Sequence, residues 1–423
     1  MKVFKFGGAS VKNAEAVKNV AAILSLYEGQ KITVVVSAMG KTTNKLEEIV
    51  WALRDADKKN FYNLVDDLAA YHDEILGDLF QERHYGIYNF IETLFENLKD
   101  RINRPFSENT AYEYDQIVSL GEVISSHILA SFLVEKGFSA EWSDARKLIR
   151  TDNTYQEGKV DWQKTESLIQ ERFIPLFQQS NIVVTQGFLG HTAEGFTTTL
   201  GREGSDYTAG IFAYCTNAEE VTIWKDVPGM LNADPKYFSD TVKLDKISFR
   251  EAIELSYYGA SVIHPKTIKP LQNKGIPLYV KSFIEPKAEG TVIQASTEND
   301  HLVASFIFKK EQILFSFTPK DFSFIVEENL GSIFNRLAQA RVHINLMQNS
   351  ALSFSILTDQ SKVNIEEILT LFRESYEVKY NEGLELITIR HYDDATLKKV
   401  TEGKEILLQQ LTRHTARIVA KKR

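Results

Sequence analysis

Apolar and polar residues alternate along the first 295 residues in a repeating order of short strands and longer helices. Runs of β-branched and aromatic residues, which are typical of buried strands, occur at residues 3–6, 31–39, 138–142, 181–184 and 221–224. Stretches with helical spacing of apolar residues separate them. Because strands that alternate with helices form parallel sheets covered on both faces, the pattern predicts an α/β fold, a sandwich with a mostly parallel central sheet.

The pattern changes twice along the chain. Residues 46–115 are largely helical in pattern and nearly free of glycine, which predicts a helical insertion in the first domain. The composition changes again at residues 285–300, which read as the exit from that domain. We therefore expect a first domain at residues 1–295 and a second region at 300–423.

The second region has the order βαββαβ, which is typical of a ferredoxin-like α+β unit. This first unit is expected at residues 311–383. A second unit is expected from residues 300–310 together with 384–423, with a helix at 395–411. It is incomplete at its C-terminal end.

Composition narrows the class of protein. The 423 residues carry 49 basic and 57 acidic side chains, and the net charge of -8 disfavours nucleic acid as a partner. The single cysteine, Cys215, excludes an internal disulfide and a cysteine-based zinc site. The first residues run directly into a strand pattern, and no apolar run approaches membrane-spanning length. We expect a cytoplasmic protein without a membrane partner.

Residues 185–215 contain the clearest candidate for a ligand-binding site. Glycines let backbone N–H groups approach a ligand, threonine hydroxyls donate hydrogen bonds, and Ser205 and Asp206 open a helix whose N-terminus attracts anions. Arg202 adds a positive charge. Ordinary strand–loop–helix connections use the same residue types, but their clustering here favours a phosphate site.

A second strand–glycine–helix unit opens the chain. Gly7 and Gly8 end the first strand, and Ser10 can cap the helix that follows. Lys5, at the end of the strand, could reach a phosphate oxygen or could be a surface lysine.

The loop after the second strand contains Gly-Lys-Thr at residues 40–42. A P-loop also requires a glycine at position 35, where the chain has Val35, so this motif is absent. Ser37 and Thr43 remain as polar side chains at the end of a strand, where open α/β sheets bind ligands.

Two other segments hold candidate ligand-binding residues. Glu122 interrupts an apolar helical face, so its carboxylate is either solvated or binds a substrate ammonium group. The loop at residues 224–236 is either a plain connection or holds a purine and presents Lys225, Asp226 and Lys236 to phosphates.

Together these motifs resemble the aspartate kinases of the amino acid kinase family, which carry C-terminal ACT modules. The matching pieces lie in family order and cover nearly all of the chain. They are KFGGAS at 5–10, VVVSAMGKTTN at 34–44, SLGE at 119–122, TTTLGREGSDYTA at 197–209, WKDVPG at 224–229, ADPK at 233–236 and YGASVIHPKT at 258–267.

The resemblance implies transfer of the γ-phosphoryl group of ATP to the β-carboxylate of L-aspartate, giving 4-phospho-L-aspartate and ADP. This is the first step of lysine, threonine and methionine biosynthesis. Mg²⁺ is expected with the nucleotide, and no metal-ligating side chain is assigned. The expected catalytic residues are Lys5 and Asp206. The expected aspartate-binding residues are Ser37, Thr43, Glu122, Arg202 and Ser205. The expected ATP-binding residues are Lys5, Gly7, Gly8, Ser10, Trp224, Lys225, Asp226, Leu231, Lys236 and Ser261.

The chain departs from the family pattern at several positions. Ala9 replaces a threonine, Glu203 a glycine, Leu231 a tyrosine, Lys236 an arginine and Ser261 a lysine. Loss of that lysine removes a phosphate contact, for which Lys225 or Lys266 could substitute. We expect weaker nucleotide binding with intact chemistry.

The ACT modules imply an amino-acid effector, lysine or threonine, with Asn345 and Ser350 as candidate contacts. The usual glycine-bearing loop is, however, replaced by residues 326–330. The modules also imply a homodimer, because an incomplete sheet leaves an edge to be paired. Two other interpretations stay open: an amino acid kinase for a different carboxylate or carbamate, and a catalytically inactive amino-acid sensor.

Overall fold

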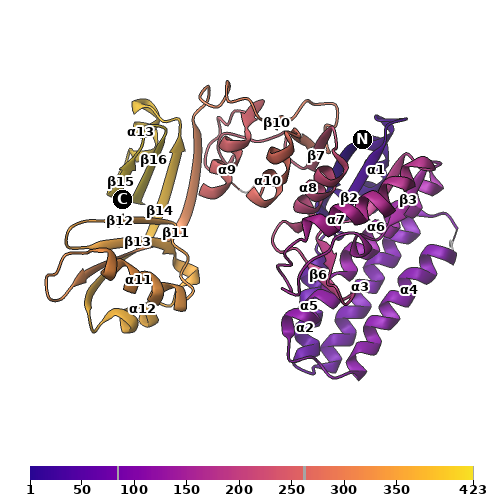
Figure 1. Ribbon diagram of the computed structural model, residues 1–423, viewed down its shortest axis with the longest axis horizontal. Coiled ribbons are helices and arrows are strands. Elements are labelled where there is room, and N and C mark those ends of the chain that lie inside the picture. Colours follow the sequence, from indigo (N-terminus) through magenta and orange to yellow (C-terminus); the bar gives the residue numbers. More distant parts are fainter. Residues whose placement is uncertain (83–84, 261–262, 423) are drawn as a thin grey trace. The chain divides into compact units, whose positions relative to one another are not determined.

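The structure, a computed structural model, describes residues 1–82, 85–260 and 263–422. The chain forms two compact units (Figure 1). Unit 1 consists of Met1–Met230, Lys243–Tyr257 and Ser261–Asp300. Unit 2 consists of Leu231–Val242, Tyr258–Ala260 and His301–Arg423. Two segments from within the first 295 residues therefore belong to unit 2.

Unit 1 is built on an eight-stranded sheet in the order β3-β4-β2-β1-β7-β9-β10-β8. Its strands are β1 (Lys2–Phe6), β2 (Ile32–Val36), β3 (Ala140–Ser143), β4 (Ile182–Gln186), β7 (Glu220–Lys225), β8 (Lys246–Ser248), β9 (Leu278–Ser282) and β10 (Thr291–Gln294). Among the described residues, every neighbouring pair in this sheet is parallel except β9 with β10. The predicted α/β fold with a mostly parallel sheet is confirmed.

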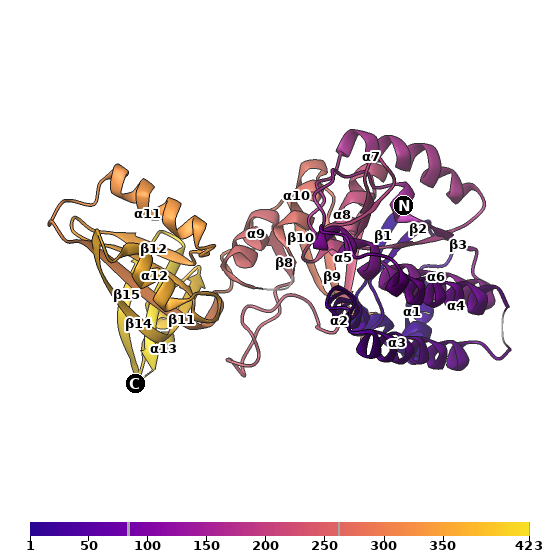
Figure 2. The ribbon, with the colours of Figure 1, turned by 90° about the horizontal axis from the view of Figure 1, so that it is seen from below.

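Helices cover both faces of this sheet (Figure 2). One face carries α1 (Ala14–Ser25), α3 (Lys58–Leu79), α4 (Tyr85–Asp100) and α6 (Leu120–Glu135). The other face carries α7 (Trp162–Leu168), α8 (Gly204–Thr216) and α10 (Pro265–Lys274). Unit 1 also contains α2 (Thr42–Arg54), α5 (Thr110–Val118), α9 (Phe249–Tyr258) and a two-stranded ladder of β5 (Leu189–His191) and β6 (Thr197–Thr199).

The two faces of β1 and β7 differ because side chains alternate along a strand. Phe6 and Trp224 point to one face, where they stack with ring centroids 6.0 Å apart and join the buried core below α1 and α6. Lys5 pairs in register with Ile223, so it shares the opposite face with Ile223 and Lys225. This opposite face is the one that α8 covers.

The segment Thr110–Glu135, which contains α5 and α6, is long and apolar enough to cross a membrane. Of its most apolar window, 78% is buried inside the structure, as in the core helix of a soluble protein. The prediction that no apolar run approaches membrane-spanning length is therefore wrong for this segment. Polar residues such as Asp115 and Glu122 interrupt its sequence, and they are buried too.

Unit 2 contains a six-stranded antiparallel sheet in the order β12-β13-β11-β14-β16-β15. Its strands are β11 (Ser305–Pro319), β12 (Leu346–Asn349), β13 (Phe354–Asp359), β14 (Tyr376–Arg390), β15 (Lys404–Leu411) and β16 (Thr415–Lys422). Its helices are α11 (Glu327–Gln339), α12 (Ile365–Phe372) and α13 (Asp394–Thr401). The long strands β11 and β14 each serve two ferredoxin-like halves, one with β12 and β13 and one with β15 and β16.

The predicted helix at residues 395–411 is wrong in its second part. Helix α13 ends at Thr401, and Lys404–Leu411 forms β15, which pairs with β16. Gly403 reverses the chain between them with a φ of 72°, a conformation open to glycine. A short apolar run such as KEILLQQL fits either helix or strand, and only pairing with β16 decides between them.

Asn345 is buried in unit 2, and its side chain is engaged by its own chain. Its oxygen accepts a hydrogen bond from Lys309 Nζ at 2.9 Å. Its amide nitrogen donates to Gln312 Oε1 at 2.8 Å and to Asp359 Oδ1 at 2.9 Å. Burial opposes ionisation of Asp359, yet hydrogen bonds led by that from Gln312 lower its pKa to about 2. Ser350, by contrast, is exposed and bonds within its own turn.

We therefore expect Asn345→Ala to lower the free energy of unfolding of unit 2 by about 1–3 kcal/mol, because it strands buried polar partners. Urea denaturation followed by circular dichroism measures this. Tryptophan fluorescence, which reports only unit 1, should keep its midpoint. Ser350→Ala is the matched control and should stay within about 0.5 kcal/mol. Equal effects of the two substitutions would contradict the structural role of Asn345.

Candidate active site

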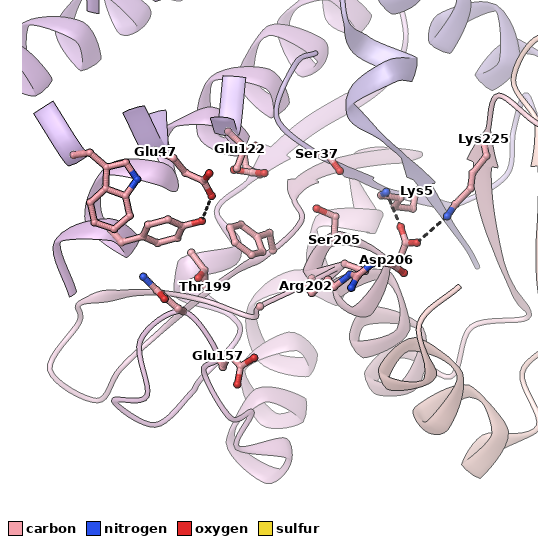
Figure 3. Close-up of a pocket in the computed structure, with 18 residues that line it drawn as sticks. Lys5, Ser37, Glu47, Glu122, Glu157, Thr199, Arg202, Ser205, Asp206 and Lys225 are labelled. Carbon is pink, nitrogen blue, oxygen red and sulfur yellow. Dashed lines mark hydrogen bonds and ion pairs between the residues drawn. The ribbon is translucent and has the colours of Figure 1, made fainter. Parts of the chain in front are cut away.

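A cavity of about 750 Å³ opens in unit 1 where β1, β2 and β7 end and α8 begins (Figure 3). Carboxyl ends of parallel strands and a helix N-terminus both favour ligand binding, and the N-terminus favours anions. The lining residues are Lys5, Ser37, Thr43, Glu47, Trp51, Tyr114, Glu122, Gln156, Glu157, Phe188, Thr199, Gly201, Arg202, Glu203, Gly204, Ser205, Asp206 and Lys225.

A buried ion pair lies at one end of this cavity. Lys5 Nζ lies 2.6 Å from Asp206 Oδ1, and Lys225 Nζ lies 3.5 Å from Asp206 Oδ2. Burial opposes ionisation of Asp206, yet the charges of Lys5 and then Lys225 hold its pKa below the usual value. The two predicted catalytic residues are thus in direct contact, and three charged groups meet where an anion could bind.

The glycines after β1 bring backbone close to this pair. Gly8 packs so tightly that a Cβ there would lie 2.8 Å from the carbonyl oxygen of Ala38 and 2.9 Å from that of Gly40. Only glycine fits such an approach. A Cβ on Gly7 would lie 3.5 Å from Lys5 Nζ, so the loop lies beside the ammonium group. Ser10 is buried in the short turn that follows.

Glu122 is buried at the cavity wall. One carboxylate oxygen accepts a hydrogen bond from the backbone N–H of Ala38 at 3.2 Å, while Oε2 has no hydrogen-bond partner among the described residues. Burial is the main cause that raises the pKa of Glu122 to about 8. A ligand ammonium group would supply the missing partner and favour the ionised carboxylate.

The remaining predicted substrate residues surround the same space. Arg202 is exposed and Ser205 is buried at the start of α8, while Ser37 and Thr43 lie at the end of β2 and the start of α2. The cavity thus combines cationic, hydroxyl and carboxylate groups, which suits a ligand with both carboxylate and ammonium groups beside a phosphate.

Glu203 also lines the cavity, and its backbone is strained. It caps α8 in a left-handed conformation with φ 53° and ψ 28°. That conformation costs a residue with a side chain about 1–2 kcal/mol and suits glycine, the residue expected here from the family pattern. Its Oε2 is buried without a hydrogen-bond partner among the described residues.

Several cavity residues were not predicted. Tyr114 donates a hydrogen bond to Glu47 Oε1. Asp115 lies behind the cavity and accepts bonds from the backbone N–H groups of Gln156 and Thr199 and from the Thr199 hydroxyl. Burial raises the pKa of Asp115 to about 6, against the effect of these bonds. A carboxylate within an apolar helical face was the available signal, as it was for Glu122.

Some predicted ATP-binding residues lie elsewhere. The Trp224 side chain is only 1% exposed, in the hydrophobic core, so the prediction that it lines the nucleotide side is wrong for the indole. The alternation of β7 points it away from Lys225. Asp226 is exposed and does not line the cavity, Leu231 and Lys236 belong to unit 2, and Ser261 lies outside the described residues.

No group of three or more histidine, cysteine, aspartate or glutamate side chains is placed to hold a metal in the part of the chain that the structure describes. Asp206 is already shared by two ammonium groups.

Comparisons with known proteins show the family and the fold. The model of the amino acid kinase family matches residues 1–282. Lysine-sensitive aspartokinase 3 of Escherichia coli is 30% identical over 413 residues, which cover 96% of this chain and 89% of that protein. The crystal structure of E. coli aspartokinase III in complex with aspartate and ADP superposes with a TM-score of 0.80 at 27% identity, covering 100% of this chain and 96% of that one. Its complex with lysine and aspartate gives 0.82 at 28% identity, covering 99% and 95%.

The fold and the matched family define an ATP-dependent kinase that phosphorylates a carboxyl group. The chain belongs to the amino acid kinase family and, within it, to the aspartokinases.

The strain at Glu203 generates a prediction. Glu203→Gly should raise the free energy of unfolding by about 0.5–1 kcal/mol, because relief of about 1–2 kcal/mol exceeds the entropic cost of glycine. Glu203→Ala removes the same charge but keeps a Cβ, so it should not share this gain. Thermal or urea unfolding measures both, and a gain in the alanine variant as large as in the glycine variant would contradict backbone strain as the cause.

Proposed function

We propose that this chain transfers the γ-phosphoryl group of ATP to the β-carboxylate of L-aspartate. The observation that carries the proposal is one cavity with two unlike ends. Glu122 and Arg202 offer partners for an ammonium and a carboxylate. Lys5 and Lys225, which both contact Asp206, provide a cationic site next to glycine backbone. An amino acid with a second carboxylate can bridge these ends.

The attacking carboxylate is already ionised at neutral pH, so the reaction needs no general base. The site must instead align two anions and stabilise the charge on the transferred group. Lys5 would contact the transferring phosphoryl group, and Asp206 would orient Lys5. Arg202 would hold the α-carboxylate of aspartate, with Ser37, Thr43 and Ser205 adding hydrogen bonds.

ATP would enter from the Lys225 side, with Gly7, Gly8 and Ser10 close to its phosphates. Mg²⁺, a hard cation that binds phosphate oxygens, would arrive with the nucleotide and neutralise part of its charge. Asp226, Leu231, Lys236 and Ser261 stay as sequence-based candidates for the nucleotide side.

Unit 2 would serve regulation and assembly. The long β11 and β14 join both ACT halves in one sheet that ends in β12 and β15, and the Gln410 side chain of β15 donates a hydrogen bond to the Met347 carbonyl oxygen of β12. A homodimer through this region is part of the proposal. The engagement of Asn345 within its own chain means that a lysine or threonine effector would have to displace existing hydrogen bonds or bind through Ser350 and its neighbours. We propose a cytoplasmic location.

Aspartate, ATP, magnesium and hydroxylamine should give aspartyl hydroxamate and ADP in equal amounts. Lys5→Ala should lower kcat by about 10²–10³-fold, since it removes a cation from the phosphoryl site. Wild-type protein without hydroxamate at saturating ATP would refute the proposal and favour an amino-acid sensor. Product with another carboxylate acceptor but none with aspartate would favour a different amino acid kinase. Lysine or threonine added to the same assay tests regulation, and an unchanged rate with both would contradict it.

Glu122 predicts a pH dependence. Its raised pKa of about 8 keeps it protonated at neutral pH, whereas an ammonium ligand needs the carboxylate. The KM for aspartate should therefore fall about tenfold per pH unit as pH rises from about 6 to 8, and then level off. Glu122→Gln should remove this dependence and raise KM by about 10–100-fold.

Unfolding provides the control for this variant. A carboxyl whose folded pKa exceeds its unfolded value of about 4.3 costs stability as pH rises from about 4.3 to 8. Glu122→Gln should not show this loss, so its melting temperature at about pH 8 should equal or exceed that of wild type. A flat KM profile in the wild type would contradict the ammonium-binding role.

A further inference from the structure

Lys225, the last residue of β7, brings a second ammonium group to the buried carboxylate of Asp206 (Figure 3). Lys5 contacts one carboxylate oxygen at 2.6 Å and Lys225 the other at 3.5 Å. Both lysines line the cavity, and both lie on the face of the sheet that α8 covers. One carboxylate therefore holds two cations, one on each oxygen.

The charges show what the second cation adds. The pair of Lys5 and Asp206 alone is close to neutral and would attract a phosphate weakly. With Lys225, two positive charges face one negative charge, so these three groups together carry a net charge of about +1. Transfer of a phosphoryl group spreads negative charge over its oxygens, which a fixed cation stabilises.

The contacts of Lys5 and Lys225 with Asp206 differ in distance and in exposure. The Lys225 side chain is 24% exposed and lies 3.5 Å from Asp206. The Lys5 side chain is 10% exposed and lies 2.6 Å from Asp206. The longer distance makes the Coulomb attraction of Lys225 to Asp206 weaker than that of Lys5.

The alternative substitute for the lysine expected at position 261 is Lys266. It is exposed at the start of α10 and is not among the residues that line this cavity. Lys225, by contrast, lines the cavity beside Asp206. Its strand, β7, is next to β1, which carries Lys5.

We propose that Lys225 is a catalytic residue that contacts the γ-phosphoryl oxygens during transfer and replaces the family lysine that Ser261 removes. This rests on the proposed aspartate kinase activity. A β-carboxylate oxygen of aspartate forms the new bond to the γ-phosphorus as the bond to the β–γ bridging oxygen breaks. ADP leaves with that electron pair, and Lys225 contributes charge without transferring a proton.

The test replaces and then restores the ammonium group. Lys225→Cys should lower kcat by about 10²–10³-fold and leave the KM for aspartate within about threefold. Treatment with 2-bromoethylamine then converts the introduced thiol to an aminoethyl thioether, an ammonium group at lysine length. Activity should return to within about tenfold of wild type. The native Cys215 is buried, and burial raises its thiol pKa to about 12, so it should not react.

Two controls match this variant. Lys281 pairs in register with Trp224 on the neighbouring strand β9 and does not line the cavity, so Lys281→Cys should keep kcat within about twofold. Alkylation of Lys225→Cys with iodoacetamide adds a neutral group of similar length and should not restore activity. Circular dichroism verifies folding, and Lys225→Arg should retain more activity than the cysteine variant because it keeps the charge.

A kcat for Lys225→Cys within about threefold of wild type would overturn the proposal. Equal recovery with the neutral and the cationic reagent would also overturn it. A wild-type protein without activity on aspartate would instead count against the proposed function. In that case ATP affinity measured by calorimetry decides: a loss of at least about tenfold in Lys225→Cys supports the phosphate contact, and a smaller loss overturns it.

Discussion

The carboxylate of Asp206, buried between two ammonium groups, is the constraint on which unit 1 depends. Removing a charge from water costs several kcal/mol unless opposite charges and hydrogen bonds compensate. Three elements must meet for this compensation: β1 carries Lys5, β7 carries Lys225, and the first turn of α8 carries Asp206. The parallel register of β1 and β7 aligns the lysines on one face, and the opposite face of the same strands packs Phe6 and Trp224 into the core. Stability and chemistry thus come from the alternation of the same two strands.

The other end of the cavity uses the opposite electrostatic arrangement. Glu122 is buried and accepts a hydrogen bond from the backbone N–H of Ala38, and its burial favours the neutral form against that bond and the charge of Lys5. A charged carboxylate there would repel a phosphate bound nearby. A neutral carboxylic acid avoids this repulsion and ionises when a substrate ammonium group binds. The site would thus carry a permanent positive end for the phosphoryl group and a conditional negative end for the amino acid. Glu203 does not fit this arrangement, because it adds backbone strain and a carboxylate where glycine would add neither.

Much of this site could be predicted from sequence, for reasons that differ from residue to residue. Lys5 lies near the end of β1, just before two glycines, and Arg202, Ser205 and Asp206 follow glycines. A parallel sheet brings its strand ends to one edge. Trp224 was misplaced because its motif was interpreted without the period-two alternation of β7, which directs the indole into the core. Pairing partners far apart in sequence were harder to predict. The strand at Lys404–Leu411 forms because it pairs with β16. The segment Leu231–Val242 belongs to unit 2 because it contacts residues about seventy positions later, as in the hydrogen bond from the Asn232 side chain to the Ala304 carbonyl oxygen. The contact of Tyr114 with Glu47 likewise joins two helices that no local pattern relates.

In the proposed reaction, a carboxylate oxygen of aspartate attacks the γ-phosphorus of ATP in this cavity. Aspartate labelled with ¹⁸O in its β-carboxylate, together with ATP, magnesium and hydroxylamine, tests it directly. Hydroxylamine attacks the acyl carbon and expels phosphate, which keeps the bridging oxygen that came from aspartate. The account predicts that ³¹P NMR of the released phosphate shows one ¹⁸O per molecule, in proportion to the label. Phosphate without label would mean that water is the acceptor and would contradict the account.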